Sequence, residues 1–266
     1  MTGRAIKKRI LAALALLPIA FAQQRSFVAC PIVRDTKTVP CFLAESEGQT
    51  YFLAIQQDIQ ADLYPPQLLH EVLVEGTVAP GPPVCGGIPL KPVKLSVLPE
   101  LNLACNMILP AEPGIEAPPT RRPAGPSTKQ APVIPAGAPP AARPAPPQRS
   151  AGPFTRRDFQ ITYDFDSAFL FSRDTRVVSQ AAAYATAAQA KTVEVTAHRA
   201  ASLLSNGRVL TENEAIAAQR AERVVDILRG LGTNPASIQV HIVPEVVKPD
   251  GVTDPEKRLL TIRVTP

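Results

Sequence analysis

Arg220 is the side chain in this sequence best placed to bind an anion. It belongs to the stretch Asn213-Glu-Ala-Ile-Ala-Ala-Gln-Arg220-Ala, which opens an amphipathic helix. The first turns of a helix carry free N–H groups and the positive end of the dipole, so a carboxylate ligand is physically favoured beside this guanidinium. The alternative is a surface arginine paired with Glu222 or Asp226 on its own helix, a contact that contributes about a few tenths of a kcal/mol.

A strand and a helix are predicted to position Arg220. Residues 193–198 alternate between apolar and polar side chains, which predicts a half-buried strand that ends near position 198. The helix is predicted to start at an N-cap, Thr211, with Glu214 completing a capping box, and to stop at Gly230 or Gly232. Its buried face is predicted from apolar residues that recur at helical spacing: Ala217, Ala221, Val224, Val225 and Leu228.

These residues resemble the outer membrane protein A C-terminal-like (OmpA-like) peptidoglycan-binding family, which includes the peptidoglycan-associated lipoprotein and the flagellar motor stator protein. The resemblance covers about residues 154–266. In that family a strand ends in Gly-His-Thr-Asp, and a helix then starts with Asn-x-x-Leu-Ser-x-x-Arg-Ala. Here the first motif reads Ala-His198-Arg-Ala200, and the second keeps Asn213 and Arg220. The loop between the motifs is about five residues longer than is usual in the family.

The resemblance implies that Arg220 binds a carboxylate of the diaminopimelate in the peptidoglycan stem peptide. Ala200 stands where the family has the Asp that takes the ammonium group, and no acidic residue follows up to position 211. A lost charge-assisted hydrogen bond costs about 1.5–3 kcal/mol, which weakens binding roughly ten- to a hundredfold. Wall binding is therefore expected to be weakened or lost.

Three further residues are candidate ligands through the same resemblance. Asn213 keeps the place of the family's Asn, with a simple turn cap as the alternative. His198 keeps the place of the family's His, and a structural residue at the strand end is its alternative. Arg258 matches the last arginine of the family's Asn-Arg-Arg-Val before the final strand, and a solvated charge at the strand end is the alternative.

Strands and helices alternate through residues 154–266, which predicts a two-layer α+β domain with a mixed sheet and helices on one face. Strands are expected at residues 159–165, 238–243 and 259–264. A helix is expected at residues 176–190 with Asp174 as its cap.

The N-terminus has the pattern of a secretory signal peptide, residues 1–22, with a basic start, an apolar run and a small-x-small cleavage site. The rival interpretation is a membrane anchor, but the run is shorter than the about 20 residues that span a bilayer. Cleavage removes four basic residues and lowers the formal net charge from +5 to about +1 (5 minus 4). Nucleic-acid binding is therefore not indicated, and the mature chain is expected to lack a transmembrane segment.

Residues 23–109 hold all four cysteines and are predicted to form a small, mainly β domain, as a twisted sheet or a partial barrel. An even number of cysteines in an exported chain favours two disulfides. Spacing leaves their pairing open; Cys30 with Cys105 would tie the ends together, and Cys41 with Cys85 would then pair inside. Zinc binding and lipidation of Cys30 are the weaker alternatives.

Residues 110–153 are rich in proline and nearly free of large apolar side chains, which predicts a disordered, semi-rigid linker. No catalytic, cofactor-binding or metal-binding pattern is found anywhere in the sequence, so an enzyme is not expected. The sequence predicts a multidomain, periplasmic protein of a Gram-negative envelope, associated with the cell wall or the outer membrane. Its C-terminal domain would tether the N-terminal domain to peptidoglycan. The alternative is a structural subunit whose OmpA-like fold is a scaffold for envelope protein partners.

Overall fold

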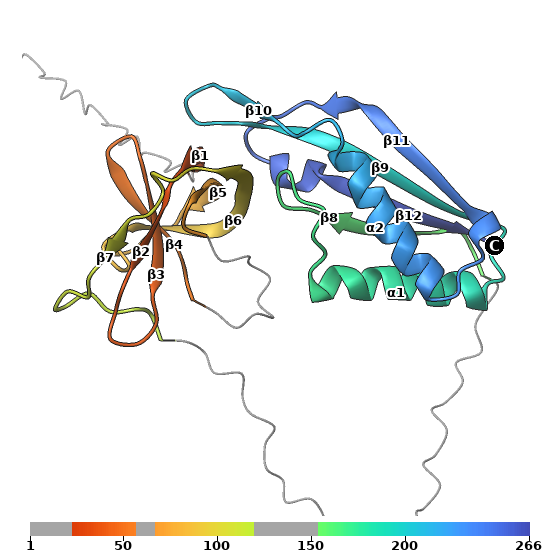
Figure 1. Ribbon diagram of the computed structural model, residues 1–266, viewed down its shortest axis with the longest axis horizontal. Helices are drawn as coiled ribbons and strands as arrows, with labels where there is room; N and C mark the ends of the chain where they lie inside the picture. The colour runs from red at the N-terminus through yellow and green to blue at the C-terminus, as the bar shows by residue number, and fades with distance from the viewer. Residues whose placement is uncertain (1–22, 57–66, 120–153) are drawn as a thin grey trace, which may run out of the picture.

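The computed structural model describes residues 23–56, 67–119 and 154–266, and its N-terminal and C-terminal parts lie side by side (Figure 1). We call residues 24–109 the N-terminal unit and residues 157–265 the C-terminal unit. The predicted signal peptide, residues 1–22, and most of the predicted linker, residues 120–153, lie outside the described residues. Within the described ranges, no helix is long and apolar enough to cross a membrane.

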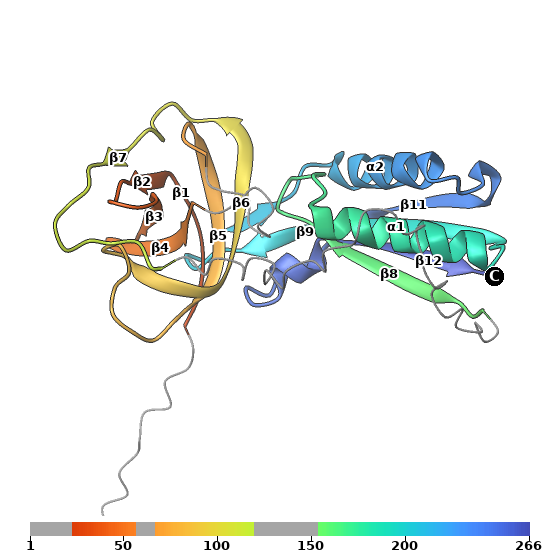
Figure 2. The same cartoon turned by 90° about the horizontal axis from the view of Figure 1, so that it is seen from below.

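The N-terminal unit is a seven-stranded sheet with the strand order β1-β5-β6-β4-β3-β2-β7. Only Cys30 separates β1 from β2, yet these strands stand near opposite ends of that order, so the sheet must fold back on itself. Figure 2 shows β5 and β6 curving around the shorter strands. The strands are β1 (Gln24–Ala29), β2 (Pro31–Arg34), β3 (Cys41–Ser46), β4 (Gln49–Ile55), β5 (His70–Val78), β6 (Ile88–Leu101) and β7 (Ile108–Leu109).

Two backbone features of this unit depend on single residues. The β3–β4 hairpin turns at Glu47 and Gly48, and both residues have positive φ. Gly76 lies at a register irregularity of β5, where an added Cβ would stand 2.8 Å from the carbonyl oxygen of Pro92. A glycine is required there because the two backbones approach too closely for any side chain.

The C-terminal unit is a mixed sheet with helices, as predicted, but it has five strands where four were expected, because β10 was not predicted. The strand order is β10-β9-β12-β8, and β11 pairs in parallel with β9. Both helices pack on the sheet through one shared core (Figure 1). The elements are β8 (Arg157–Thr162), α1 (Ser172–Ala187), β9 (Thr192–Leu203), β10 (Val209–Thr211), α2 (Ile216–Gly230), β11 (Ile238–Val247) and β12 (Leu259–Thr265), with short 3-10 turns η1 (Pro235–Ser237) and η2 (Asp254–Lys257).

The predicted boundaries around the candidate site are wrong in two places. The strand does not end near position 198, because β9 continues to Leu203 and pairs there with β10. Thr211 is not a helix N-cap, because it is the last residue of β10; α2 starts at Ile216 and ends at Gly230. Pairing between strands overrides the local capping pattern, and the expected long loop is instead a β-hairpin.

Two further boundaries also shift. Helix α1 starts before residue 176, and Asp174 lies in its first turn, where its carboxylate accepts a hydrogen bond from the N–H of Phe171 at 3.0 Å. Strand β11 continues beyond residue 243, because it resumes pairing with β9 after an irregularity between Ile242 and Val246. The sequence pattern therefore predicted that helix α1 and strand β11 exist, but not the residues at which α1 begins and β11 ends.

Candidate functional site

The guanidinium of Arg220 is fully buried and has no free donor. Its Nε donates to the carbonyl of Ser167 at 2.9 Å, Nη1 to that of His198 at 3.3 Å, and Nη2 to that of Asp164 at 3.0 Å. The remaining two N–H groups go to the carboxylate of Glu212, Nη1 to Oε2 at 3.1 Å and Nη2 to Oε1. A guanidinium has five N–H donors, and all five are used inside the chain.

Glu212 was not among the predicted residues, and it is the centre of this site. Its side chain is fully buried. Oε1 also accepts the backbone N–H of Asp166 at 3.1 Å, and Oε2 accepts that of Ala200 at 2.8 Å. Each oxygen therefore receives one guanidinium donor and one backbone donor. The available signal was that Glu212 is the first acidic residue after Ala200 in the sequence.

The other candidates near Arg220 have structural contacts. His198 reaches Arg220 through its backbone carbonyl and not through its ring. The side-chain oxygen of Asn213 accepts the N–H of Ala215 at 2.9 Å, which is the turn-capping contact. The backbone N–H of Asn213 donates to the carboxylate of Asp166 at 2.6 Å.

Two ionisable groups beside Arg220 have shifted pKa values. Burial raises the pKa of the Asp166 carboxyl; the hydrogen bond from Asn213 works against this, and the negative charge of Glu212 adds to it. Burial also raises the pKa of Tyr163, whose ring lies 4.8 Å from the guanidinium of Arg220. In both groups burial is the main cause of the shift, because it disfavours the charged form.

Arg258 is also fully buried, so the alternative of a solvated charge is wrong. Its Nη2 donates to both carboxylate oxygens of Glu75, on β5 of the N-terminal unit, and to the hydroxyl of Ser202 at 3.0 Å. The Ser202 hydroxyl in turn donates to Glu75 at 3.0 Å. Arg258 thus joins the two units.

The end of β9, the following turn and β10, residues 201–211, form what we call the docking hairpin. It extends from the C-terminal sheet toward the N-terminal unit (Figure 1). At its turn, Ser205 exchanges two hydrogen bonds with Ser26 of β1, at 2.7 and 2.9 Å. An apolar cluster between the units includes residues from both: Val28, Leu73, Leu98, Phe165, Leu204 and Leu210.

Two polar contacts outside the docking hairpin strengthen the same interface. The hydroxyl of Ser96 on β6 accepts the N–H of Phe165 at 2.8 Å. The ammonium of Lys94 lies 2.5 Å from the carboxylate of Asp164, and both side chains are mostly buried. The interface therefore combines an apolar centre with partly buried charges, which is typical of a specific contact.

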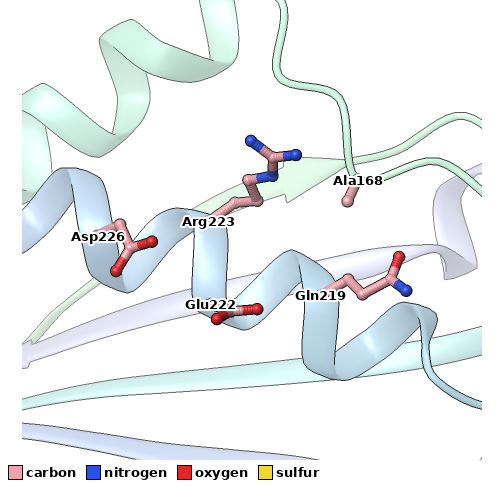
Figure 3. Close-up of a pocket in the computed structure, with 5 residues that line it drawn as sticks. All are labelled: Ala168, Gln219, Glu222, Arg223 and Asp226. Atoms are coloured by element: carbon pink, nitrogen blue, oxygen red, sulfur yellow. The ribbon is translucent and has the colours of Figure 1, made fainter.

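An open hollow of about 310 Å³ lies along α2 near Arg220. Figure 3 shows Gln219, Glu222, Arg223 and Asp226 of α2 facing it, with Ala168 on the opposite side. Arg220 is not in its lining. The exposed charges of α2 and the buried site thus belong to different faces of the helix.

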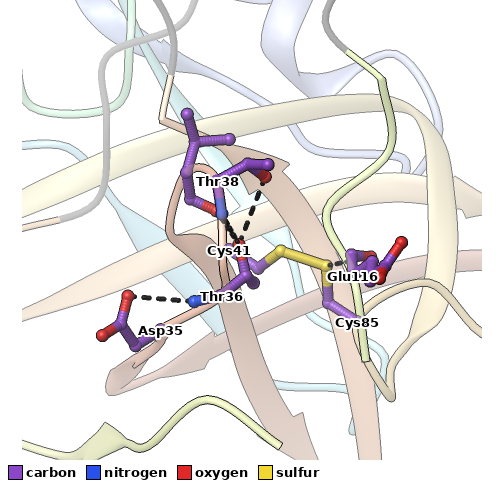
Figure 4. Close-up of a disulfide and its surroundings, with 7 residues drawn as sticks. Asp35, Thr36, Thr38, Cys41, Cys85 and Glu116 are labelled. Atoms are coloured by element: carbon purple, nitrogen blue, oxygen red, sulfur yellow. Dashed lines mark hydrogen bonds between the residues drawn. A yellow bond between two sulfur atoms is a disulfide. The ribbon is translucent and has the colours of Figure 1, made fainter. Parts of the chain in front are cut away.

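The four cysteines form two disulfides, Cys30–Cys105 and Cys41–Cys85, which is the arrangement that ties the ends of the unit together. Figure 4 shows the second bridge beside the turn that contains Thr36, with Cys85 next to the carbonyl of Glu116. No cysteine is left free. The alternatives of zinc binding through these cysteines and of lipidation at Cys30 therefore do not fit this structure.

No protein-family model matches the chain, and no curated protein sequence matches it. Among solved structures, the C-terminal region is similar to the OmpA-like domain of FopA1 from Francisella tularensis, with 15% identity, TM-score 0.33, and coverage of 41% of this chain and 71% of that one. It is also similar to the peptidoglycan-associated lipoprotein of Burkholderia pseudomallei, with 18% identity, TM-score 0.32, and coverage of 40% and 89%. It is likewise similar to the periplasmic domain of Helicobacter pylori MotB, with 14% identity, TM-score 0.34, and coverage of 42% of this chain and 74% of that one. Likeness this distant says nothing about what the chain binds.

Proposed function

We propose that this chain is a non-enzymatic protein of the bacterial envelope whose OmpA-like C-terminal unit is a scaffold for protein contacts and does not bind peptidoglycan through Arg220. One observation carries the proposal: all five N–H donors of Arg220 are used inside the chain, and the carboxylate of Glu212 takes the two that face away from the backbone carbonyls. A diaminopimelate carboxylate would have to displace Glu212.

Displacement is costly because Glu212 is fully buried. Removing one partner of a buried ion pair costs about 3–5 kcal/mol, since the other charge is left uncompensated in a medium of low polarity. That cost would subtract directly from the affinity of any ligand at Arg220. At about 1.4 kcal/mol for each factor of ten, it weakens binding by more than a hundredfold.

The contacts between the units support the scaffold role. Arg258, the second arginine that the family resemblance singled out, binds Glu75 of the N-terminal unit. The docking hairpin occupies the position of the unusually long loop, and it supplies Ser202, Leu204 and Ser205 to the same interface. The longer connection between the two family motifs therefore lies where the N-terminal unit is held.

Export to the periplasm is part of this proposal. The signal-like residues 1–22 support it, and so do the two disulfides, which persist in oxidising compartments. A partner in the envelope would then bind the assembled pair of units and not the C-terminal unit alone.

Co-sedimentation of the full chain with insoluble peptidoglycan sacculi tests the proposal. We expect the wild type and Arg220→Ala to stay in the supernatant, with Arg223→Ala as a control for loss of an exposed charge on the same helix. Ala200→Asp is not expected to restore binding, because Ala200 is fully buried and its N–H donates to Glu212. Wild type that pellets, and that is released by free diaminopimelate and by Arg220→Ala, would instead establish a wall tether.

A further inference from the structure

We propose that the outer edge of β11 is a docking surface for a second copy of this chain, so that two C-terminal sheets join into one across a twofold axis. Strand β11 pairs with β9 on one side, and among the described residues no strand pairs with its other side. The inference goes beyond the proposed function, because it names a partner and holds whether or not Arg220 binds peptidoglycan.

The first six residues of β11, Ile238–Val243, have none of the features that protect an exposed strand edge. They contain no lysine, arginine, acidic residue, glycine or proline, and four of the six are β-branched. The opposite edge of the sheet, β8, carries the charges of Arg157 and Asp158, and its apolar residues Phe159 and Ile161 are buried. Natural sheets use charges, prolines and bulges to keep their edges from pairing. The difference therefore identifies β11 as the edge that is free to pair.

Two apolar side chains of this stretch lie largely in solvent. Val240 is 47% exposed and Ile242 is 41% exposed, although Val195 and Ala197, their partners on β9, are fully buried in the core under the helices. Residues opposite each other in neighbouring strands point to the same face of a sheet. Val240 and Ile242 thus continue the apolar, helix-covered face of the sheet beyond the point where the helices cover it.

An antiparallel pairing centred on Val240 would bury this apolar surface against a copy of itself. Val240 then lies beside Val240 of the second copy, and Ile238 of each copy lies beside Ile242 of the other. Cross-strand pairs of β-branched side chains stabilise a sheet. Centring on His241 instead would set Ile238 against Pro244, which has no N–H to donate. A twofold contact uses the same surface on both chains, so the assembly closes at two copies.

Helix α2 adds a second layer to the same interface. It lies over β9 and β11, while α1 lies over β8 and β12, and Figure 2 shows α2 and β11 together at one edge. With strands about 4.8 Å apart, the two copies of α2 would lie about 10 Å apart, an ordinary distance for packed helices.

The exposed charges of α2 suit this antiparallel arrangement. Glu222 and Arg229 are both exposed, and they are about two helical turns apart, so they share one side of α2. In the twofold arrangement Glu222 of each copy faces Arg229 of the other. The contact therefore combines an apolar centre with complementary charges at its rim.

Sedimentation equilibrium of the full chain tests this inference. An interface of one strand edge and one helix is small, so we expect a dissociation constant of about 10 μM and an average mass that rises from one chain to two between about 1 and 200 μM. Val240→Lys and Ile242→Lys should each weaken the dimer at least about tenfold, because the contact would bury an unpaired charge. Gln160→Lys, at an exposed position of β8, is the matched control and should change nothing.

Charge reversal tests the twofold geometry separately. Glu222→Arg and Arg229→Glu should each weaken the dimer, and the double variant should restore it, because both reciprocal pairs are then opposite in charge again. The inference is overturned by a wild type that stays one chain at every concentration, by assembly beyond two copies, by a double variant without restoration, or by Gln160→Lys acting as strongly as Val240→Lys. Sedimentation with sacculi measures another event, so a wall-binding wild type would refute the proposed function and leave self-association standing.

Discussion

The protein contains two buried Arg–Glu pairs that differ in where their partners come from. Arg220 and Glu212 both belong to the C-terminal unit, and every donor of Arg220 has an acceptor. Arg258 and Glu75 lie 183 residues apart in the sequence and join the two units. In this second pair only Nη2 of the guanidinium is bonded, while Nε and Nη1 have no hydrogen-bond partner among the described residues.

The Arg220–Glu212 pair therefore stabilises the C-terminal unit itself, while the Arg258–Glu75 pair joins the two units. In the Arg220–Glu212 pair every guanidinium donor already has an acceptor, so an outside ligand could form no additional hydrogen bond with Arg220. The partly bonded pair is energetically weaker, because buried donors without acceptors carry a desolvation penalty. We therefore expect the Arg220 pair to control the stability of the C-terminal unit and the Arg258 pair to control attachment of the N-terminal unit.

The largest expected effect is at Arg220. Arg220→Ala should lower the free energy of unfolding by about 3–5 kcal/mol, because it leaves the carboxylate of Glu212 buried without its counter-ion. Chemical denaturation followed by circular dichroism measures the change, since the chain has no tryptophan. Arg223→Ala, exposed one turn further along α2, is the matched control and should stay within about 0.5 kcal/mol of wild type. Equal effects of the two substitutions would mean that the pair does not complete the fold.

A smaller effect is expected at the Arg258–Glu75 pair. In a double-mutant cycle of Glu75→Ala and Arg258→Ala, we expect a coupling energy of about 1.5–3 kcal/mol, because the charges interact in a buried interface. Hydrogen exchange of the docking hairpin should increase in both single variants as the units loosen. The exposed pair Asp158–Arg263, at 40% and 39% side-chain exposure, is the control cycle and should give a smaller coupling energy, because solvent screens its charges. A coupling no larger than that of the control would contradict a docking role.

The sequence predicted the structural features that depend only on residues close together in the chain. Alternation predicted a strand over residues 193–198, which lies within β9, and helical spacing predicted the buried face of α2. Each signal lies within one element, where local geometry alone decides which side chains are buried.

The sequence did not predict the partners of the two arginines. Glu212 comes back beside Ala200 only because β10 pairs with the end of β9, and that pairing was hidden under an apparent helix cap at Thr211. Glu75 has no local relation to Arg258 in the sequence, since the contact depends on how the two sheets pack against each other. Motif positions therefore singled out two arginines that are both buried, while their acceptors were set by tertiary contacts.

The smallest expected effect is a pH dependence at Asp166, whose N–H supports Glu212. Burial raises the pKa of its carboxyl in the folded protein, so the folded state binds this proton more tightly than the unfolded state, where the pKa is about 3.9. The resulting stability is fully present below that value and is lost as the pH rises through the folded pKa. Asp166→Asn keeps an acceptor for the Asn213 N–H but cannot ionise. Relative to this variant, wild type should lose less than about 1 kcal/mol between pH 3.5 and 7, because solvent screens a half-buried carboxyl. Paired denaturation curves across this range measure the difference, and a difference that does not change with pH would show that the Asp166 carboxyl is not desolvated beside the Arg220 pair.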